Sequence, residues 1–136
     1  MQSFPSWLYA HLSRFDNNFL HHAYLISGRK GVGKSLIANR LAMQVLCHSK
    51  DDILCGECHS CKLSDLENHP DFHTLKILPE KKLIGISQIH ELRSKLYESA
   101  FLGKNKAIIL PHLEKISLDG LNAFLKILEE PPENTY

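Results

Sequence analysis

Residues 28–35 constrain this chain more than any other segment. They read G-R-K-G-V-G-K-S and fit the phosphate-binding loop pattern G-x-x-x-x-G-K-[ST]. Glycines in this pattern let the backbone adopt conformations closed to residues with a Cβ, so that successive N–H groups can point at one anion. In the same pattern the lysine reaches the β- and γ-phosphates and the Ser35 hydroxyl holds Mg²⁺. The residues expected to hold nucleotide are therefore Gly28, Arg29, Lys30, Gly31, Val32, Gly33, Lys34 and Ser35.

The flanking segments suit such a loop. An apolar run at residues 23–26 predicts a buried strand before it, and residues 35–46 predict a helix after it, with Ile37, Leu41 and Val45 on one stripe. A phosphate at the start of that helix is also favoured by the helix dipole. The alternative is a glycine-rich turn with a chance Lys-Ser pair, which the strand–loop–helix context disfavours. Nucleotide binding is the expectation, and binding alone does not predict hydrolysis.

Composition narrows the class of protein. The 136 residues with 43% apolar content are enough for one modest domain, and a net charge of +1 is not that of a nucleic-acid-binding polycation. No run of 18 apolar residues predicts a membrane span, and the N-terminus lacks the basic and apolar regions of a signal peptide. We therefore expect a cytoplasmic location, where clustered cysteines are more often metal ligands than disulfides.

All four cysteines fall within fifteen positions, as C-x7-C-x2-C-x2-C. Two-residue gaps let neighbouring thiolates converge on one ion, and four sulfurs complete a tetrahedral, structural zinc site with no open position. A redox CxxC, free core thiols and an iron–sulfur cluster are the alternatives. His48 or His59 could also replace one thiolate. The segment between residues 51 and 62 is polar and expected to be exposed. The predicted zinc ligands are Cys47, Cys55, Cys58 and Cys61.

Strands and helices alternate in the rest of the chain. Residues 72–78 predict a second strand after a turn at 68–71, and residues 107–110 predict a third strand that ends at Pro111. Ser87 is expected to cap a helix with an apolar stripe of Ile89, Leu92 and Leu96. Ser117 is expected to cap a last helix whose core stripe is Leu118, Leu121, Leu125 and Leu128. This order predicts an α/β domain with a mainly parallel sheet.

The motifs and their order resemble the clamp-loader branch of the AAA+ ATPases. The phosphate loop and the four cysteines are followed by N-A-F-L-K-I-L-E-E-P-P-E at residues 122–133, which is similar to that family's closing motif, with Phe124 and Ile127 as departures. The segments at residues 4–7, 22–25, 69–72 and 86–89 resemble the delta-prime family of bacterial DNA polymerase III subunits. The resemblance implies a P-loop NTPase domain with a zinc-binding insertion at about 47–61, and a role in placing the sliding clamp on primed DNA.

The resemblance also implies partners and a limit on activity. The partners would be gamma/tau and delta subunits in a hetero-oligomer, with the clamp and primed DNA reached through the complex. An active AAA+ motor needs an Asp-Glu pair after the third strand, for Mg²⁺ and for the attacking water. This chain has Pro111 and His112 there, and Glu114 lies two residues beyond the general-base position. We therefore expect nucleotide binding with little or no ATP hydrolysis, no polymerase site of its own, and no catalytic residue; a gamma/tau-type ATPase motor is the alternative.

Residues 1–136 would form only part of the family's AAA+ domain. A fourth strand, a Ser-Arg-Cys motif, a lid and a collar domain follow in the family, and the implied sheet order is 5-1-4-3-2. The expectation is a fragment or a truncated product, in which strands 23–26 and 107–110 lack the strand between them. Two further functions are disfavoured. Around the cysteines, Asp51, Asp52, Glu57 and Asp65 outnumber Lys50 and Lys62, which disfavours a zinc-binding nucleic-acid module. Nothing in the sequence supplies the phosphoacceptor site of a P-loop kinase.

Overall fold

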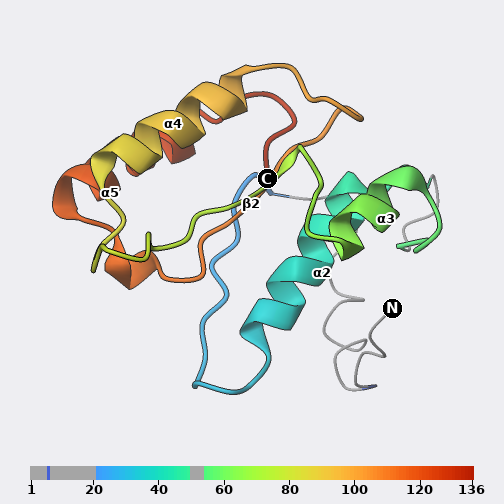
Figure 1. Cartoon of the computed structure of the whole chain (residues 1–136), viewed down its shortest axis with the longest axis horizontal. Helices are drawn as coiled ribbons and strands as arrows, with labels where there is room; N and C mark the ends of the chain where they lie inside the picture. The colour runs from blue at the N-terminus through green and yellow to red at the C-terminus, as the bar shows by residue number, and fades with distance from the viewer. Residues whose placement is uncertain (1–5, 7–20, 50–53) are drawn as a thin grey trace.

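The computed structural model describes Ser6, residues 21–49 and residues 54–136. The expectations that rest on residues 4 and 5, on residue 7 and on residues 51–53 lie outside this part of the chain. Figure 1 shows α4 and α5 side by side on one side of a short sheet, with α2 and α3 on the other side. None of the helices described has the length and apolarity to cross a bilayer. The elements are α2 (Lys34–Leu46), α3 (His59–Asp65), β1 (Phe72–Thr74), α4 (Ile86–Tyr97), β2 (Ala107–Ile109), the 3₁₀ turn η2 (Leu113–Lys115) and α5 (Leu118–Glu129).

The sheet is parallel, as expected, but short. β1 pairs with β2 in the register Phe72–Ala107 to Thr74–Ile109, and Leu75 N–H adds one further bond to the Ile109 carbonyl at 2.9 Å. The next rung in this register would need an N–H at Pro111, which has none. The predicted strand at 72–78 therefore pairs only over its first part, although Leu75 in its middle is buried.

The other edge of β2 is covered by the last residues of the chain. Lys106 and Thr135 form a parallel bridge, and Ile108 N–H donates to the Tyr136 carbonyl at 2.9 Å. Residues 23–26 do not form the strand that we predicted, and Leu25 is 80% exposed. A strand forms only beside a partner strand. The edge of β2 that faces away from β1 is already taken by Thr135 and Tyr136. The expectation that residues 107–110 would lack a partner on that edge is therefore wrong for their first half.

β2 separates two apolar clusters because its side chains alternate between the two faces of the sheet. Ala107 packs with Ala42 and Leu46 of α2, and Ile109 lies against the same cluster. Ile108 packs on the opposite side, against the larger cluster formed with α4 and α5. The buried members of that cluster are Leu75, Ile84, Ile89, Leu92, Leu96, Ile116, Phe124 and Ile127.

Helix α4 confirms the predicted apolar stripe but not its predicted cap. Ile89, Leu92 and Leu96 are all buried. The helix begins one residue before Ser87, and Gly85 is the N-cap. The Gln88 side-chain oxygen accepts the Gly85 N–H at 3.3 Å, and this bond fixes the start of the helix in place of a serine cap. Helix α3 is an element that the sequence did not predict.

Helix α5 has the predicted cap and a different buried face. The Ser117 Oγ accepts the Gly120 N–H at 3.2 Å, as an N-cap should. Leu118 and Leu125 are 74% and 45% exposed, so the predicted leucine core stripe is wrong at these two positions, while Leu121 and Leu128 are partly buried against the cluster. The helix instead buries Gly120, Phe124 and Ile127. A Cβ at Gly120 would lie 3.0 Å from the Ile116 side chain, so glycine allows the close approach that sets this rotation.

Candidate phosphate-binding loop and metal centre

The phosphate loop (residues 28–35) leads directly into α2, which begins at Lys34. Gly31 and Gly33 have φ of +89° and +84°, a region that favours glycine, and this permits the sharp turn before the helix. The Lys34 ammonium folds back over the loop, donating to the Gly28 carbonyl at 2.7 Å and to the Arg29 carbonyl at 2.8 Å. The predicted loop residues thus come together in one turn.

The start of α2 is open to a ligand. Gly33 is the N-cap, no side chain caps the first N–H groups, and the first turn has no acidic residue. Ser35 is exposed in this first turn. Uncapped helix N–H groups and the positive end of the helix dipole attract anions. The arrangement can therefore receive a phosphate, with a lysine and a hydroxyl beside it.

The end of β2 has no acidic pair. Pro111 and His112 are both exposed there, and His112 Nδ1 lies 3.3 Å from a carboxylate oxygen of Glu114. The Glu114 pKa lies below its usual value, first because its own backbone N–H bonds the carboxylate and then because of His112. A carboxylate with a lowered pKa is a weaker general base. This geometry does not favour Glu114 as a substitute for the missing glutamate.

The four cysteines meet at one point. Their Sγ atoms all lie within 4.8 Å of one another. Cys47 Sγ is 3.5 Å from Cys55 Sγ, and Cys55 Sγ is 3.8 Å from Cys61 Sγ. Sulfurs at the zinc–sulfur distance of about 2.3 Å stand about 3.8 Å apart in a regular tetrahedron. The donor set can therefore hold a tetrahedral metal ion, and within the described residues this cluster includes neither His48 nor His59.

Backbone N–H groups point at these sulfurs, as the outer partners of a metal site do. Ser49, Cys58 and Cys61 each donate their N–H to a cysteine Sγ at 3.4 Å. The N–H groups of Cys58 and Glu57 lower the pKa of Cys55 to about 6. Burial raises the Cys58 pKa, but N–H groups including that of His48 outweigh it, and the net shift is downward. Burial raises the pKa of Cys61.

Helix α3 carries two of the cysteine-module residues into the interior. Cys58 is the N-cap of α3, and its sulfur accepts the Cys61 N–H. Cys61 and Ser60 are 1% and 0% exposed, so the expectation that this whole segment is exposed is wrong at these positions. The Ser60 hydroxyl donates to the Leu46 carbonyl at 2.6 Å, on the last residue of α2. The cysteine module (residues 47–61) is thereby joined to the helix that follows the phosphate loop.

His69 completes this connection. The Asp71 N–H donates to His69 Nδ1 at 3.1 Å, which leaves the proton of the neutral ring on Nε2. His69 Nε2 lies 2.7 Å from Ser60 Oγ and donates to it. Burial lowers the His69 pKa, which favours the same neutral form. The sequence predicted neither this bond nor a role for Ser60.

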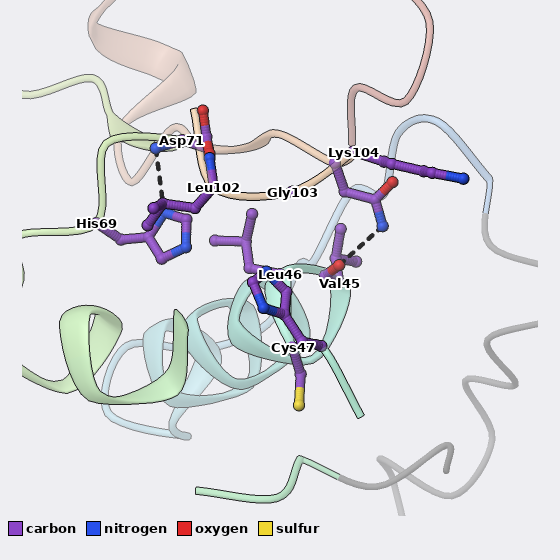
Figure 2. A pocket seen from close by; sticks show the side chains of 10 residues that line it. Val45, Leu46, Cys47, His69, Asp71, Leu102, Gly103 and Lys104 are labelled. Carbon is purple, nitrogen blue, oxygen red and sulfur yellow. Dashed lines mark hydrogen bonds between the residues drawn. The ribbon is translucent and has the colours of Figure 1, made fainter. Parts of the chain in front are cut away.

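A hollow of about 400 Å³ lies between the last turn of α2 and the Leu102–Asn105 segment. Figure 2 shows His69 and Asp71 on one side of it and Leu46 and Cys47 below. The buried Asp71 carboxylate accepts the N–H groups of Phe101 and Leu102 at 2.7 and 2.9 Å. Asn105 donates its side-chain N–H to the Val45 carbonyl at 2.9 Å. These bonds hold the segment against α2.

Comparison with known proteins identifies one family along almost the whole chain. The family model described as DNA polymerase III, delta subunit, matches residues 8–136. DNA polymerase III subunit delta' of Haemophilus influenzae is 37% identical over 90% of this chain, and that of Yersinia pestis is 40% identical over 85%. The chain spans 37% and 34% of the length of these two relatives.

Related subunits of another kind also match. DNA polymerase III subunit tau/gamma of Haemophilus influenzae is 36% identical over 86% of this chain, but the match covers only 17% of that protein. The crystal structure of a DNA polymerase III gamma subunit-related protein from Thermotoga maritima is 38% identical, covers 48% of this chain and 22% of its own, and has a TM-score of 0.43. That score is too low to compare the folds. Because the family model spans all but the first seven residues, the chain belongs to the DNA polymerase III delta subunit family.

Proposed function

We propose that this chain is part of a delta-prime-type clamp-loader subunit, which helps to place the sliding clamp on primed DNA. The observation that carries the proposal is the similarity to several subunits named delta' along most of the chain. In this proposal residues 1–136 form part of an AAA+ domain, and the partners are gamma/tau and delta subunits. The clamp and DNA are reached through that complex, in the cytoplasm.

Reconstitution tests the assembly. Purified gamma/tau and delta are mixed with and without the full protein, and the complex is followed by gel filtration and by clamp loading on primed DNA. We expect one hetero-oligomer, with loading restored only when the protein is present. Separate elution of the protein from both partners contradicts the proposal.

The phosphate loop is proposed to bind ATP or ADP with Mg²⁺, and to turn it over slowly or not at all. Lys34 would exchange the Gly28 and Arg29 carbonyls for phosphate oxygens, and Ser35 would supply an oxygen to the ion. The exposed Pro111 and His112 support the absence of turnover, since neither can replace the acidic pair. This is the feature that separates the proposal from a gamma/tau-type motor.

Calorimetry with Mg·ADP and a phosphate-release assay with Mg·ATP test this part. We expect binding without turnover above background, and a loss of about 10–100-fold in affinity for Lys34→Met, which removes a charged hydrogen bond. Lys126→Met removes an exposed lysine of α5, outside the loop, and is the control, with the affinity of wild type. Robust hydrolysis by the isolated protein would instead favour the motor.

Zinc is the metal that we propose for the four cysteines, in a structural role. The sulfur-only donor set and the sulfur separations near those of a tetrahedron support zinc. Metal analysis of the purified protein should find about one zinc per chain. Iron with a visible absorbance, or no metal at all, would overturn the assignment.

A further inference from the structure

Helix α2 connects the two candidate sites. Its N-cap, Gly33, belongs to the phosphate loop, and its C-cap, Cys47, is one of the four cysteines. Thirteen residues of α-helix span about 20 Å at 1.5 Å per residue. In Figure 1, α2 runs from the phosphate loop to the region where α3 packs. One element thus carries a ligand site at each end.

The two ends of α2 are held differently. At the C-terminal end, the side chains of Leu41, Ala42, Val45 and Leu46 are buried. At the N-terminal end, none of residues 34–39 is buried. Lys34, Ile37 and Ala38 there are partly buried and the others are exposed. A helix is cooperative, so a segment with little packing of its own is helical mainly because it continues a packed segment. The N-terminal half, which presents the N–H groups to a phosphate, therefore depends on the C-terminal half for its order.

The cysteine module caps that C-terminal half. Ser60 bonds the Leu46 carbonyl, the Cys47 N–H donates to the Gln44 carbonyl at 3.2 Å, and Asn105 bonds the Val45 carbonyl. The last carbonyls of an α-helix have no N–H four residues further along the helix, and these bonds satisfy them. Two of the three bonds come from the cysteine module: Ser60 lies between two of the cysteines, and Cys47 is itself one. A metal ion that fixes the four sulfurs therefore also fixes the caps from Ser60 and Cys47.

We propose that metal binding at the four cysteines strengthens nucleotide binding at residues 28–35, with α2 as the coupling element. This inference rests on the proposed nucleotide function. The two states of α2 are one with its N-terminal half helical and one with that half frayed. Metal favours the first state through the caps, and nucleotide favours it because phosphate needs the ordered N–H groups. By linkage, Mg·ADP must raise the metal affinity by the same factor as metal raises the Mg·ADP affinity.

The experiment measures both directions of this coupling on the full chain. Calorimetry gives the Mg·ADP affinity of the zinc-loaded protein and of protein stripped with a chelator that is then removed. Competition with a chromophoric chelator gives the zinc affinity with and without Mg·ADP. Couplings of this kind are typically about 5–150-fold, and we expect about tenfold in each direction. Hydrogen exchange should show the N-terminal half of α2 better protected when zinc is bound.

A pair of serine variants tests the cap itself without removing the metal. Ser60→Ala breaks the bond to the Leu46 carbonyl and also the bond from His69, and it leaves all four cysteines in place. Ser64→Ala changes another buried serine of α3, whose hydroxyl has no hydrogen-bond partner in the described structure. We expect both variants to keep zinc, and only Ser60→Ala to lose Mg·ADP affinity, by several-fold. This comparison stays decisive even if the stripped protein unfolds.

The outcomes separate the inference from the function on which it rests. Mg·ADP binding that is equal with and without zinc, and equal in the two serine variants, overturns the coupling and leaves nucleotide binding intact. No Mg·ADP binding to any form overturns both. A change in only one direction of the linkage would also contradict the coupling, because the two factors must be equal at equilibrium.

Discussion

His69 lies where the turn before β1 meets the cysteine module, and its two ring nitrogens have different partners. Nδ1 accepts the Asp71 N–H and Nε2 donates to Ser60. A second proton on Nδ1 would face the Asp71 N–H and break that bond. Burial also disfavours the charged ring, and the His69 pKa falls below its ordinary value of 6.5. Stability should depend on pH through this residue.

The sign of the pH dependence follows from proton uptake. Just below pH 6.5 the unfolded chain binds a proton at His69 that the folded chain does not, so acid favours unfolding. The contribution of the neutral His69 ring to the free energy of unfolding is fully present above about pH 6.5, and it is lost as the pH falls. We predict that His69→Gln loses about 1–3 kcal/mol at pH 7.5, because Ser60 and Asp71 lose a partner, and less at pH 5.5.

Urea unfolding at several pH values measures this prediction. Wild type and His69→Gln are compared at each pH, so that changes common to both, including any loss of metal in acid, cancel. His22→Gln removes an exposed histidine and is the control, with the same stability as wild type at every pH. A gap between wild type and His69→Gln that stays constant from pH 7.5 to 5.5 would refute the role of the ring proton.

Among the helices, hydrophobic spacing predicted where α4 and α5 form better than it predicted which face of each helix is buried. α4 has its predicted stripe inside, because only one face of this helix is apolar. α5 is apolar on more than one face, so periodicity alone did not decide between its leucines and Phe124. The close packing of Gly120 against Ile84 and Ile116 decides it. The predicted strand at 23–26 is wrong and the one at 72–78 is confirmed only over its first part, for a related reason, since a strand needs a partner that local sequence does not specify.

Gly120→Ala tests this packing. Alanine favours a helix over glycine by about 1 kcal/mol, but here its Cβ would lie 3.0 Å from Ile116 Cγ2 and 3.0 Å from Ser117 Oγ. Overpacking typically costs about 1–3 kcal/mol, so we predict a net loss of up to about 2 kcal/mol in the free energy of unfolding. Asn122→Ala is the control on the exposed face of the same helix, and it should be neutral or slightly stabilising. If Gly120→Ala is instead more stable than wild type, α5 can move to make room for the new Cβ, and the close packing at Gly120 does not fix the helix.

At the scale of the whole molecule, β2 joins the layer that contains both candidate sites to the layer of α4 and α5. Ala107 is 2% exposed and faces Ala42, so two small residues bring α2 close to the sheet. On the other face, Ile108 contacts the cluster of α4 and α5. The position of α2, and with it the phosphate loop and Cys47, therefore depends on the small volume at this contact.

Ala107→Leu should wedge α2 away from the sheet. We predict a loss of about 1–3 kcal/mol, as for other overpacked cores, with hydrogen exchange faster in α2 than in α4. Ile109→Leu keeps the volume on the same face of β2 and is the control, with a loss below about 1.5 kcal/mol. Uniform acceleration of exchange in both helices would argue against two separately held layers.

The local chemistry of this protein follows from short stretches of its amino-acid sequence. Some motifs join residues that are close together in the sequence, so short-range spacing was enough to predict them. They are the glycines and Lys34 of the phosphate loop, the four clustered cysteines and the Ser117 cap. The absence of an Asp-Glu pair at residues 111 and 112 was also visible, because it depends on residue type alone. Even so, no sequence pattern pointed to Ser60 and Asn105 as partners of α2, or to His69 as the partner of Ser60.

Tertiary structure decided how these local pieces are connected. The Ser60–Leu46 bond joins residues fourteen apart and the Asn105–Val45 bond joins residues sixty apart, so neither follows from periodicity. The same holds for the edge of β2, which Thr135 and Tyr136 cover instead of residues 23–26. Buried polar groups and strand edges must find partners wherever the chain brings them. That requirement is met only in three dimensions, and it places the cysteine module at the end of the phosphate-loop helix.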